Sequence, residues 1–102
     1  DEFITDKPTL VELDGRFNNG EYLQRNGYLR FAWHNDAATA YLFVAGEAYF
    51  VELAAGETLS WLTTKSQLDQ KDWQQLRKYP ALADVCCELV AEGAFYWPED
   101  FI

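Results

Sequence analysis

Residues 39–52 decide the fold of this chain and read TAYLFVAGEAYFVE. The two halves of the stretch, residues 39–44 and 47–52, are rich in aromatic and β-branched residues, a composition that favours strands. Between them, either Ala45-Gly46 or the pair that begins at Gly46 offers the two-residue turn of a hairpin. The stretch therefore predicts two antiparallel strands.

A third strand is expected just before this hairpin. Residues 28–33, YLRFAW, again have a strand-forming composition. His34-Asn35-Asp36 then predicts a turn, because Asn and Asp side chains hydrogen-bond to the backbone of their own turn. Three consecutive strands joined in this way would form an antiparallel β-meander.

One helix is predicted upstream of the meander. Residues 1–7 are expected to be a linker or tail. The helix is expected to begin at Pro8, with Asp6 as its cap, because proline is favoured in a first helical turn. Apolar residues at helical spacing from Leu10 to Phe17 would give this helix one buried face.

Three more helices and a short strand are predicted downstream of the meander. Leucines at helical spacing mark residues 57–64, and Asp69 with Asp72 resembles a capping box at the start of the next helix. Residues 81–92 carry apolar side chains at i, i+3, i+4, i+7 and i+8. Residues 94–97 are apolar and precede a proline, which suits a short terminal strand.

Together these elements predict an α+β fold of the winged-helix type, a small antiparallel β-meander packed with three to four short helices. The hairpin precedes most of the helices, whereas a wing more often follows them. A chain of 102 residues can bury one hydrophobic core. Residues 8–102 are therefore expected to form a single domain.

The charge of the chain limits the partners that it can bind. Eight basic residues stand against 17 acidic ones, a formal net charge of −9. Nucleic acids and anionic membranes are disfavoured, because phosphate binding requires Lys and Arg. The predicted helix at residues 81–92 carries Asp84, Glu88 and Glu92 but no basic residue. The expected partner is a protein, and a basic protein surface would suit this charge.

The two cysteines, Cys86 and Cys87, are adjacent within a predicted helix. Neighbouring side chains on a helix point about 100° apart, which disfavours a mutual disulfide or a shared metal. We expect buried thiols in a reducing compartment, with a cytoplasmic location. The chain contains no methionine, and together with its linker-like start this suggests a fragment of a longer protein.

The triplet His34-Asn35-Asp36 matches the His-x-Asp half of a two-histidine, one-carboxylate iron site. His34 is the only histidine in the chain, so the second imidazole of such a site is lacking. The same shortage of histidine disfavours a zinc site and a Cys–His catalytic pair. We therefore expect no catalytic residue, no metal ligand and no cofactor in this chain.

The aromatic residues of the meander exceed what one buried face requires. Tyr41 and Phe43 would share a face opposite Leu42 and Val44, and Tyr49 or Phe50 would lie near them. A small domain buries one face of a sheet easily and two with difficulty, so the second face is a candidate interface. The candidate interaction surface is Tyr41, Phe43, Tyr49, Asp84, Glu88 and Glu92.

Two quoted stretches carry a resemblance to a known family. LFVAGEAYFV at residues 42–51 contains a strand that ends in Val-x-Gly-Glu. Further on, a helix ends in Leu-x-x-x-Gly-x-x-Tyr-Trp and runs into GAFYWPED at residues 93–100. With the intervening Leu-rich and Asp-initiated helices, this order resembles the C-terminal winged-helix domain of the bacterial Jumonji-C ribosomal protein hydroxylases, also called cupin-4 proteins. The resemblance covers residues 8–100.

The resemblance implies a division of labour within a longer protein. In that family an N-terminal Jumonji-C barrel holds Fe(II) and binds 2-oxoglutarate, and a helical dimerisation region and an acidic winged helix follow. This chain would be the last of these parts, with both cofactors confined to the missing barrel. Its implied role is a non-catalytic, protein-interacting one, which stabilises the parent or helps to place a basic ribosomal protein substrate.

Two alternatives stay open at this point. A free-standing acidic binder, such as an inhibitor or immunity protein that masks a basic partner, fits the charge equally well. A small enzyme of another type would require a polar pocket with at least two converging titratable groups.

Overall fold

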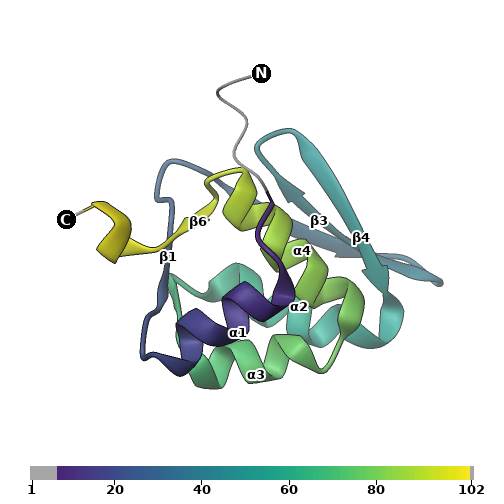
Figure 1. Cartoon of the computed structure of the whole chain (residues 1–102). Coiled ribbons are helices and arrows are strands. Elements are labelled where there is room, and N and C mark those ends of the chain that lie inside the picture. Colours follow the sequence, from purple (N-terminus) through teal and green to yellow (C-terminus); the bar gives the residue numbers. More distant parts are fainter. Residues whose placement is uncertain (1–6, 102) are drawn as a thin grey trace.

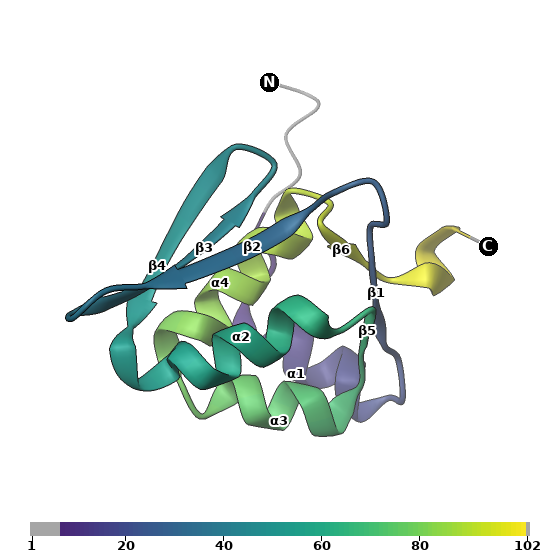
Figure 2. The same ribbon diagram turned by 180° about the vertical axis from the view of Figure 1, so that it is seen from behind.

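A computed structural model describes residues 7–101 of the chain (Figures 1 and 2). It is a mixed α+β structure, as predicted. The helices and strands are α1 (Leu10–Asn18), β1 (Leu23–Arg25), β2 (Phe31–Asn35), β3 (Thr39–Val44), β4 (Glu47–Glu52), η1 (Leu53–Ala55), α2 (Gly56–Thr64), β5 (Gln67–Leu68), α3 (Gln70–Arg77), α4 (Pro80–Ala91), β6 (Phe95–Tyr96) and η2 (Pro98–Phe101), where η denotes a 3-10 helix.

The predicted meander is present as the antiparallel sheet β2-β3-β4, which we call the wing sheet. The bounds predicted for β3 and β4 are confirmed residue for residue. The turn between them is Ala45-Gly46, with φ values of 52° and 86°. Positive φ at both central residues is the geometry of the hairpin turns that match strand twist, which decides between the two predicted turns. Figure 1 shows this hairpin projecting from the helices.

The start and end of β2 differ from the prediction. The strand begins at Phe31 rather than Tyr28, and it continues through His34 to Asn35. His34 lies opposite Tyr41 in the register with β3, so cross-strand pairing overrides the local turn preference of this segment. The predicted turn at His34-Asn35-Asp36 is therefore wrong for its first two residues.

A second small sheet, in the order β5-β1-β6, was not predicted. Leu23 lies opposite Leu68, and Gln24 lies opposite Tyr96, in two antiparallel pairings. Strands of two or three residues are too short to show an alternating pattern. The predicted strand at 94–97 is present as β6, but it pairs with β1 and not with the hairpin.

The helix ends show which capping predictions hold. Helix α1 begins at Leu10 rather than Pro8, because the Thr9 side chain accepts the Glu12 N–H at 3.1 Å and caps the helix there. The predicted cap, Asp6, lies outside the described residues. The predicted capping box of α3 is confirmed, with Asp69 and Asp72 each bonded to the other's backbone N–H at 3.0 Å.

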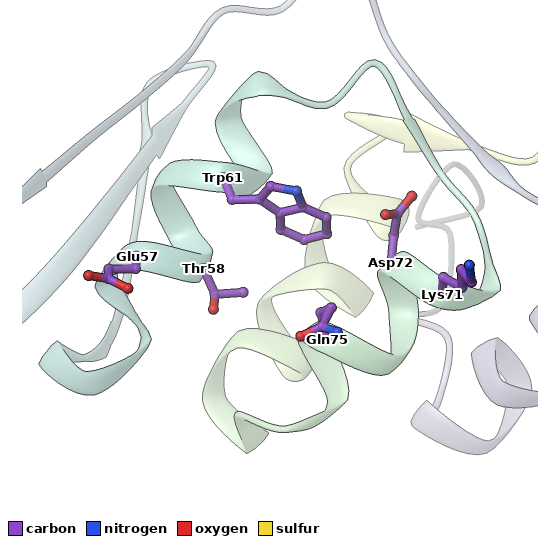
Figure 3. A pocket seen from close by; sticks show the side chains of 6 residues that line it. All are labelled: Glu57, Thr58, Trp61, Lys71, Asp72 and Gln75. Atoms are coloured by element: carbon purple, nitrogen blue, oxygen red, sulfur yellow. The ribbon is translucent and has the colours of Figure 1, made fainter.

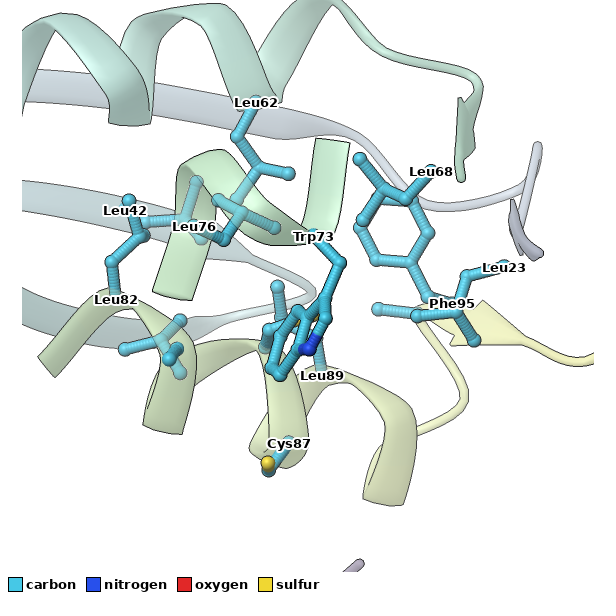
Figure 4. Close-up of a cluster of buried hydrophobic side chains, with 14 of the residues drawn as sticks. Leu23, Leu42, Leu62, Leu68, Trp73, Leu76, Leu82, Cys87, Leu89 and Phe95 are labelled. Carbon is cyan, nitrogen blue, oxygen red and sulfur yellow. The ribbon is translucent and has the colours of Figure 1, made fainter. Parts of the chain in front are cut away.

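The hydrophobic core lies between the helices and both sheets. Figure 4 shows leucines of α2, α3 and α4, including Leu62, Leu76 and Leu82, gathered within it. Phe17 of α1 is fully buried, and its ring stacks on Trp73 at 5.3 Å and meets Trp97 edge-on at 5.0 Å. Among residues 7–101, no polar or charged residue is buried.

Only one face of the wing sheet contributes to this core. Helix α2 packs against β2 and β3, and α4 packs against β4. The turned view of Figure 2 shows α2 running beside β2. Leu42, Val44 and Val51 point into this interior and are buried. The opposite face, which we call the outer face, carries the alternate residues of each strand.

Candidate functional site

The outer face of the wing sheet carries a cluster of aromatic rings. Tyr41 is central: it stacks on His34 at 6.2 Å and on Phe43 at 6.3 Å, and it meets Phe50 edge-on at 5.3 Å. Phe43 is 43% exposed and Phe50 is 61% exposed. Large rings in such numbers on one exposed face are typical of an interaction surface.

A carboxylate lies beside the aromatic cluster. Asp36 accepts the backbone N–H groups of Ala38 at 2.8 Å and Thr39 at 2.9 Å, and the Tyr41 hydroxyl at 2.7 Å. These hydrogen bonds hold the pKa of Asp36 below its ordinary value, chiefly through Ala38. The bond to Asp36 raises the pKa of Tyr41 in turn. At neutral pH the cluster therefore combines a neutral Tyr41 phenol with the Asp36 anion.

The structure separates Tyr49 from the other two predicted aromatic residues. Tyr49 lies opposite Leu42 in the register, on the face that packs on the helices, and it is half-buried. Burial raises the pKa of its hydroxyl, and the nearby carboxylates of Glu92 and Glu88 raise it further. Tyr49 thus borders the acidic side of α4, where a hollow of 280 Å³ lies between α4 and β4.

The acidic residues of α4 form the second part of the predicted surface. Lys7 places its Nζ 2.8 Å from an Asp84 carboxylate oxygen and 3.7 Å from one of Glu88. The hydrogen bond to Asp84 raises the pKa of Lys7. The helix itself carries no basic residue, and Lys7 from the segment before α1 partly neutralises these two carboxylates. Glu92 lines the adjacent hollow with Tyr49.

The six predicted residues therefore form two groups and not one surface. Tyr41 and Phe43 lie on the outer face of the wing, whereas Tyr49 of β4 borders Glu88 of α4 and its C-cap residue Glu92, and Asp84 shares Lys7 with Glu88. The predicted interaction surface did not include His34, and it included Phe50 only as an alternative to Tyr49. The register supplies the missing signal, because residues opposite one another share a face, and Phe50 lies opposite Tyr41. An interaction role for either group stays a prediction.

The donor set of this chain does not fit an Fe(II) site. His34 stacks on Tyr41, and the neighbouring Asp36 is engaged with its own turn. Across residues 7–101, no three His, Cys, Asp or Glu side chains are grouped so that they could hold a metal ion. The His-x-Asp triplet at residue 34 is thus part of a strand and its turn, with no second imidazole to complete a triad.

The cysteines also lack the setting of a catalytic nucleophile. Cys86 and Cys87 are both free and buried in α4. Burial raises the pKa of both thiols, which opposes formation of the reactive thiolate. His34 lies on the exposed outer face of the wing and not beside them. The prediction of packed thiols is confirmed.

A polar hollow of 420 Å³ lies between α2 and α3 (Figure 3). Asp72, on its wall, is engaged in the capping box and lies 3.5 Å from Lys65. The other charged residues of the wall, Glu57 and Lys71, lie at opposite ends in Figure 3. The hollow therefore lacks the pair of converging titratable groups that a small enzyme requires.

Comparison with known families settles the relationship of the chain. A family model described as ROXA-like winged helix matches residues 4–96. The chain belongs to the ROXA-like winged-helix family. The resemblance noted from the sequence is confirmed, and the wing sheet with the helices around it is the ROXA-like winged-helix fold. No curated protein sequence matches the chain.

A solved structure agrees with this assignment. The ROXA-like domain superimposes on YcfD, a ribosomal oxygenase from Escherichia coli, with a TM-score of 0.68 and 20% sequence identity. The match covers 88% of this chain but 23% of YcfD, so the chain spans about a quarter of that oxygenase. At this identity the likeness shows a shared fold. Within residues 7–101, the helices are too short to cross a bilayer.

Proposed function

We propose that this ROXA-like domain is a non-catalytic accessory domain of an Fe(II)- and 2-oxoglutarate-dependent ribosomal protein hydroxylase. Its role is to contact protein: it stabilises the parent enzyme and helps to place a basic protein substrate. The catalytic barrel and both cofactors belong to other parts of that parent. A cytoplasmic location, where ribosomal proteins are made, goes with this proposal.

The observation that carries the proposal is the family match, which covers residues 4–96, together with the share of YcfD that the chain spans. A domain equivalent to 23% of a ribosomal oxygenase leaves most of such an enzyme for the catalytic parts. The shortage of metal-ligating side chains supports an accessory role. The chain has one histidine, and the neighbouring Asp36 is hydrogen-bonded to the backbone of its own turn.

The charge of the domain supports a basic partner. The formal net charge is −9, and α4 presents Asp84, Glu88 and Glu92 along one helix. Ribosomal proteins are basic because they bind RNA, so opposite charge would favour their encounter with this domain. Duplex DNA or RNA would be repelled by the same carboxylates.

The test is removal of the domain from its parent hydroxylase. Without residues 7–101, we expect the parent to keep Fe(II) and 2-oxoglutarate binding but to show a higher KM for a basic ribosomal protein, a lower melting temperature, or both. Calorimetry, thermal unfolding and hydroxylation kinetics measure these quantities. Loss of Fe(II) binding in a folded truncated enzyme would contradict the proposal, as would a gene that encodes this domain alone.

A further inference from the structure

The basic residues of the chain are distributed unevenly. None of the eight lies within residues 31–64, which form the wing sheet, η1 and α2. The same segment carries four carboxylates, which are Asp36, Glu47, Glu52 and Glu57. The strands of the wing thus present anions and aromatic rings without any cation of their own.

Elsewhere in the chain, rings and carboxylates are combined with a cation. The Arg16 guanidinium lies 4.4 Å from the centre of the Trp97 ring and bonds to Glu21 and Asp100, each at 2.6 Å. This arrangement joins a cation–π contact to charge-assisted hydrogen bonds, both of which favour arginine.

The Arg77 site repeats the pattern, whereas the Arg25 site combines a ring with a cation without a carboxylate. Arg77 bonds to Asp14 at 3.0 Å and lies 5.9 Å from the Trp73 ring centre. On the inner side of the wing, Arg25 lies 4.0 Å from the centre of the Phe31 ring. The chain therefore supplies its own arginine to several aromatic rings of the core and its margins.

The outer face of the wing has the same rings and carboxylates, and no cation–π contact or ion pair within residues 7–101 involves them, although Arg30 directly precedes β2. Tyr41, Phe43 and Phe50 provide exposed rings, and Asp36 is bonded to the Tyr41 hydroxyl. Glu52 lies opposite Thr39, two residues from the Tyr41–Phe50 pair, and so shares this face. Rings bordered by two carboxylates are complementary to guanidinium groups supplied from outside.

We propose that the outer face of the wing sheet binds arginine side chains in an extended segment of a basic protein. This inference rests on the proposed function and deepens it, since it names the surface that contacts the basic partner. Arginine is preferred to lysine, because its planar guanidinium stacks on Tyr41, Phe43 or Phe50 while it bonds to Glu52 or to Asp36 Oδ2, which accepts a single hydrogen bond within the chain. A lysine ammonium gains the charge attraction but stacks less well.

The test uses the full chain and a fluorescein-labelled peptide of alternating arginine and glycine. Fluorescence anisotropy gives its Kd, and matched peptides carry lysine or uncharged citrulline in place of arginine. We expect the arginine peptide to bind several-fold more tightly than the lysine peptide, and the citrulline peptide to bind most weakly. Equal affinity for arginine and lysine peptides would overturn the inference.

Variants locate the binding surface. Phe43→Ser with Phe50→Ser removes two exposed rings, and we expect about a tenfold weaker Kd, since each cation–π contact at an exposed site contributes modestly. Phe101→Ser is the matched control, because Phe101 is 77% exposed but lies outside the wing. Circular dichroism confirms folding, and backbone amide shifts in NMR spectra report where the peptide binds.

Each outcome separates the two proposals. The inference is supported if the peptide shifts the amide signals of β3 and β4 in the wild type and no longer does so in the Phe43→Ser, Phe50→Ser variant. Shifts confined to α4, with an unchanged Kd in the double variant, overturn it but leave the proposed basic-partner role intact. A homodimer of the chain that the double variant dissociates would also overturn it, because a second copy would then cover the outer face.

Discussion

The helical part of the molecule and the wing use their aromatic and charged residues in opposite ways. Around α1 and α3, Phe17 and Trp73 are buried against each other, and Arg16 and Arg77 are bonded to carboxylates from distant parts of the chain. In the wing, Phe43 and Phe50 are exposed and the strands carry no cation. In the helical part, the aromatic rings and charged groups contact one another, whereas the wing has exposed rings and carboxylates that a partner can contact. We therefore expect the helical part to dominate stability, and we propose that the wing contacts the partner.

The largest expected contrast is between two phenylalanines. Phe17→Ala should lower the free energy of unfolding by about 3–5 kcal/mol, because it leaves a cavity between Trp73 and Trp97. Phe50→Ala should lower the free energy of unfolding by about 1 kcal/mol or less, since the ring is mostly exposed and the main loss is the higher strand propensity of Phe. Urea unfolding followed by tryptophan fluorescence measures both. Similar losses for the two variants would show that the wing ring is part of the core.

A second test concerns the ion pair that joins α1 to α3. Asp14 accepts the Trp73 indole N–H at 2.6 Å and two N–H groups of Arg77 at 3.1 and 3.0 Å. Asp14→Asn should lower the free energy of unfolding by about 1–2 kcal/mol at pH 7. Asp84→Asn is the matched control: its pair with Lys7 is more exposed, so the expected loss is about 0.5 kcal/mol or less.

The same variant carries a pH signature. The bonds from Arg77 and then Trp73 hold the pKa of Asp14 below its ordinary value of 3.8. A lowered folded-state pKa contributes stability that is present above the unfolded-state value and is lost as pH falls through the folded-state value. The difference between wild type and Asp14→Asn should therefore shrink below about pH 4. A difference that stays constant from pH 7 to pH 3 would contradict the ionic origin.

The smallest expected effect is at the tip of the wing. Ala45 has a φ of 52°, which is unfavourable for a residue with a Cβ other than Asn or Asp. Ala45→Asn should raise the free energy of unfolding by about 0.5–1 kcal/mol, because Asn-Gly is the preferred pair for this turn. Thermal unfolding measures the gain, and the affinity for the arginine peptide should not change. A loss of stability would show that the turn geometry is different.

The parts of the fold that sequence reasoning predicted share a physical cause. The bounds of β3 and β4 were predicted because alternation and a two-residue turn act within one short stretch, and the capping box at Asp69 is equally local. The β5-β1-β6 sheet was missed because its pairs, such as Leu23 with Leu68, join segments far apart in sequence. No local pattern specifies such a pairing.

The candidate site shows the same limit. Tyr41 and Phe43 share a face by simple alternation, and this was predicted. The prediction grouped Tyr49 with them, but the register places Phe50 and not Tyr49 on their face. Which residues of β4 share a face with Tyr41 depends on the turn that joins the two strands. The bond from Lys7 to Asp84 likewise depends on the path of the chain before α1.

The most direct test of the central claim, that this domain acts by contact with protein and not by holding a metal, is a titration of the isolated chain with Fe(II) under anaerobic conditions. Isothermal calorimetry, with and without 2-oxoglutarate, reports the stoichiometry and affinity. We predict no one-to-one uptake of Fe(II) and no consumption of 2-oxoglutarate when a basic ribosomal peptide is added. Tight binding of one Fe(II) per chain, or turnover of the peptide, would contradict the account.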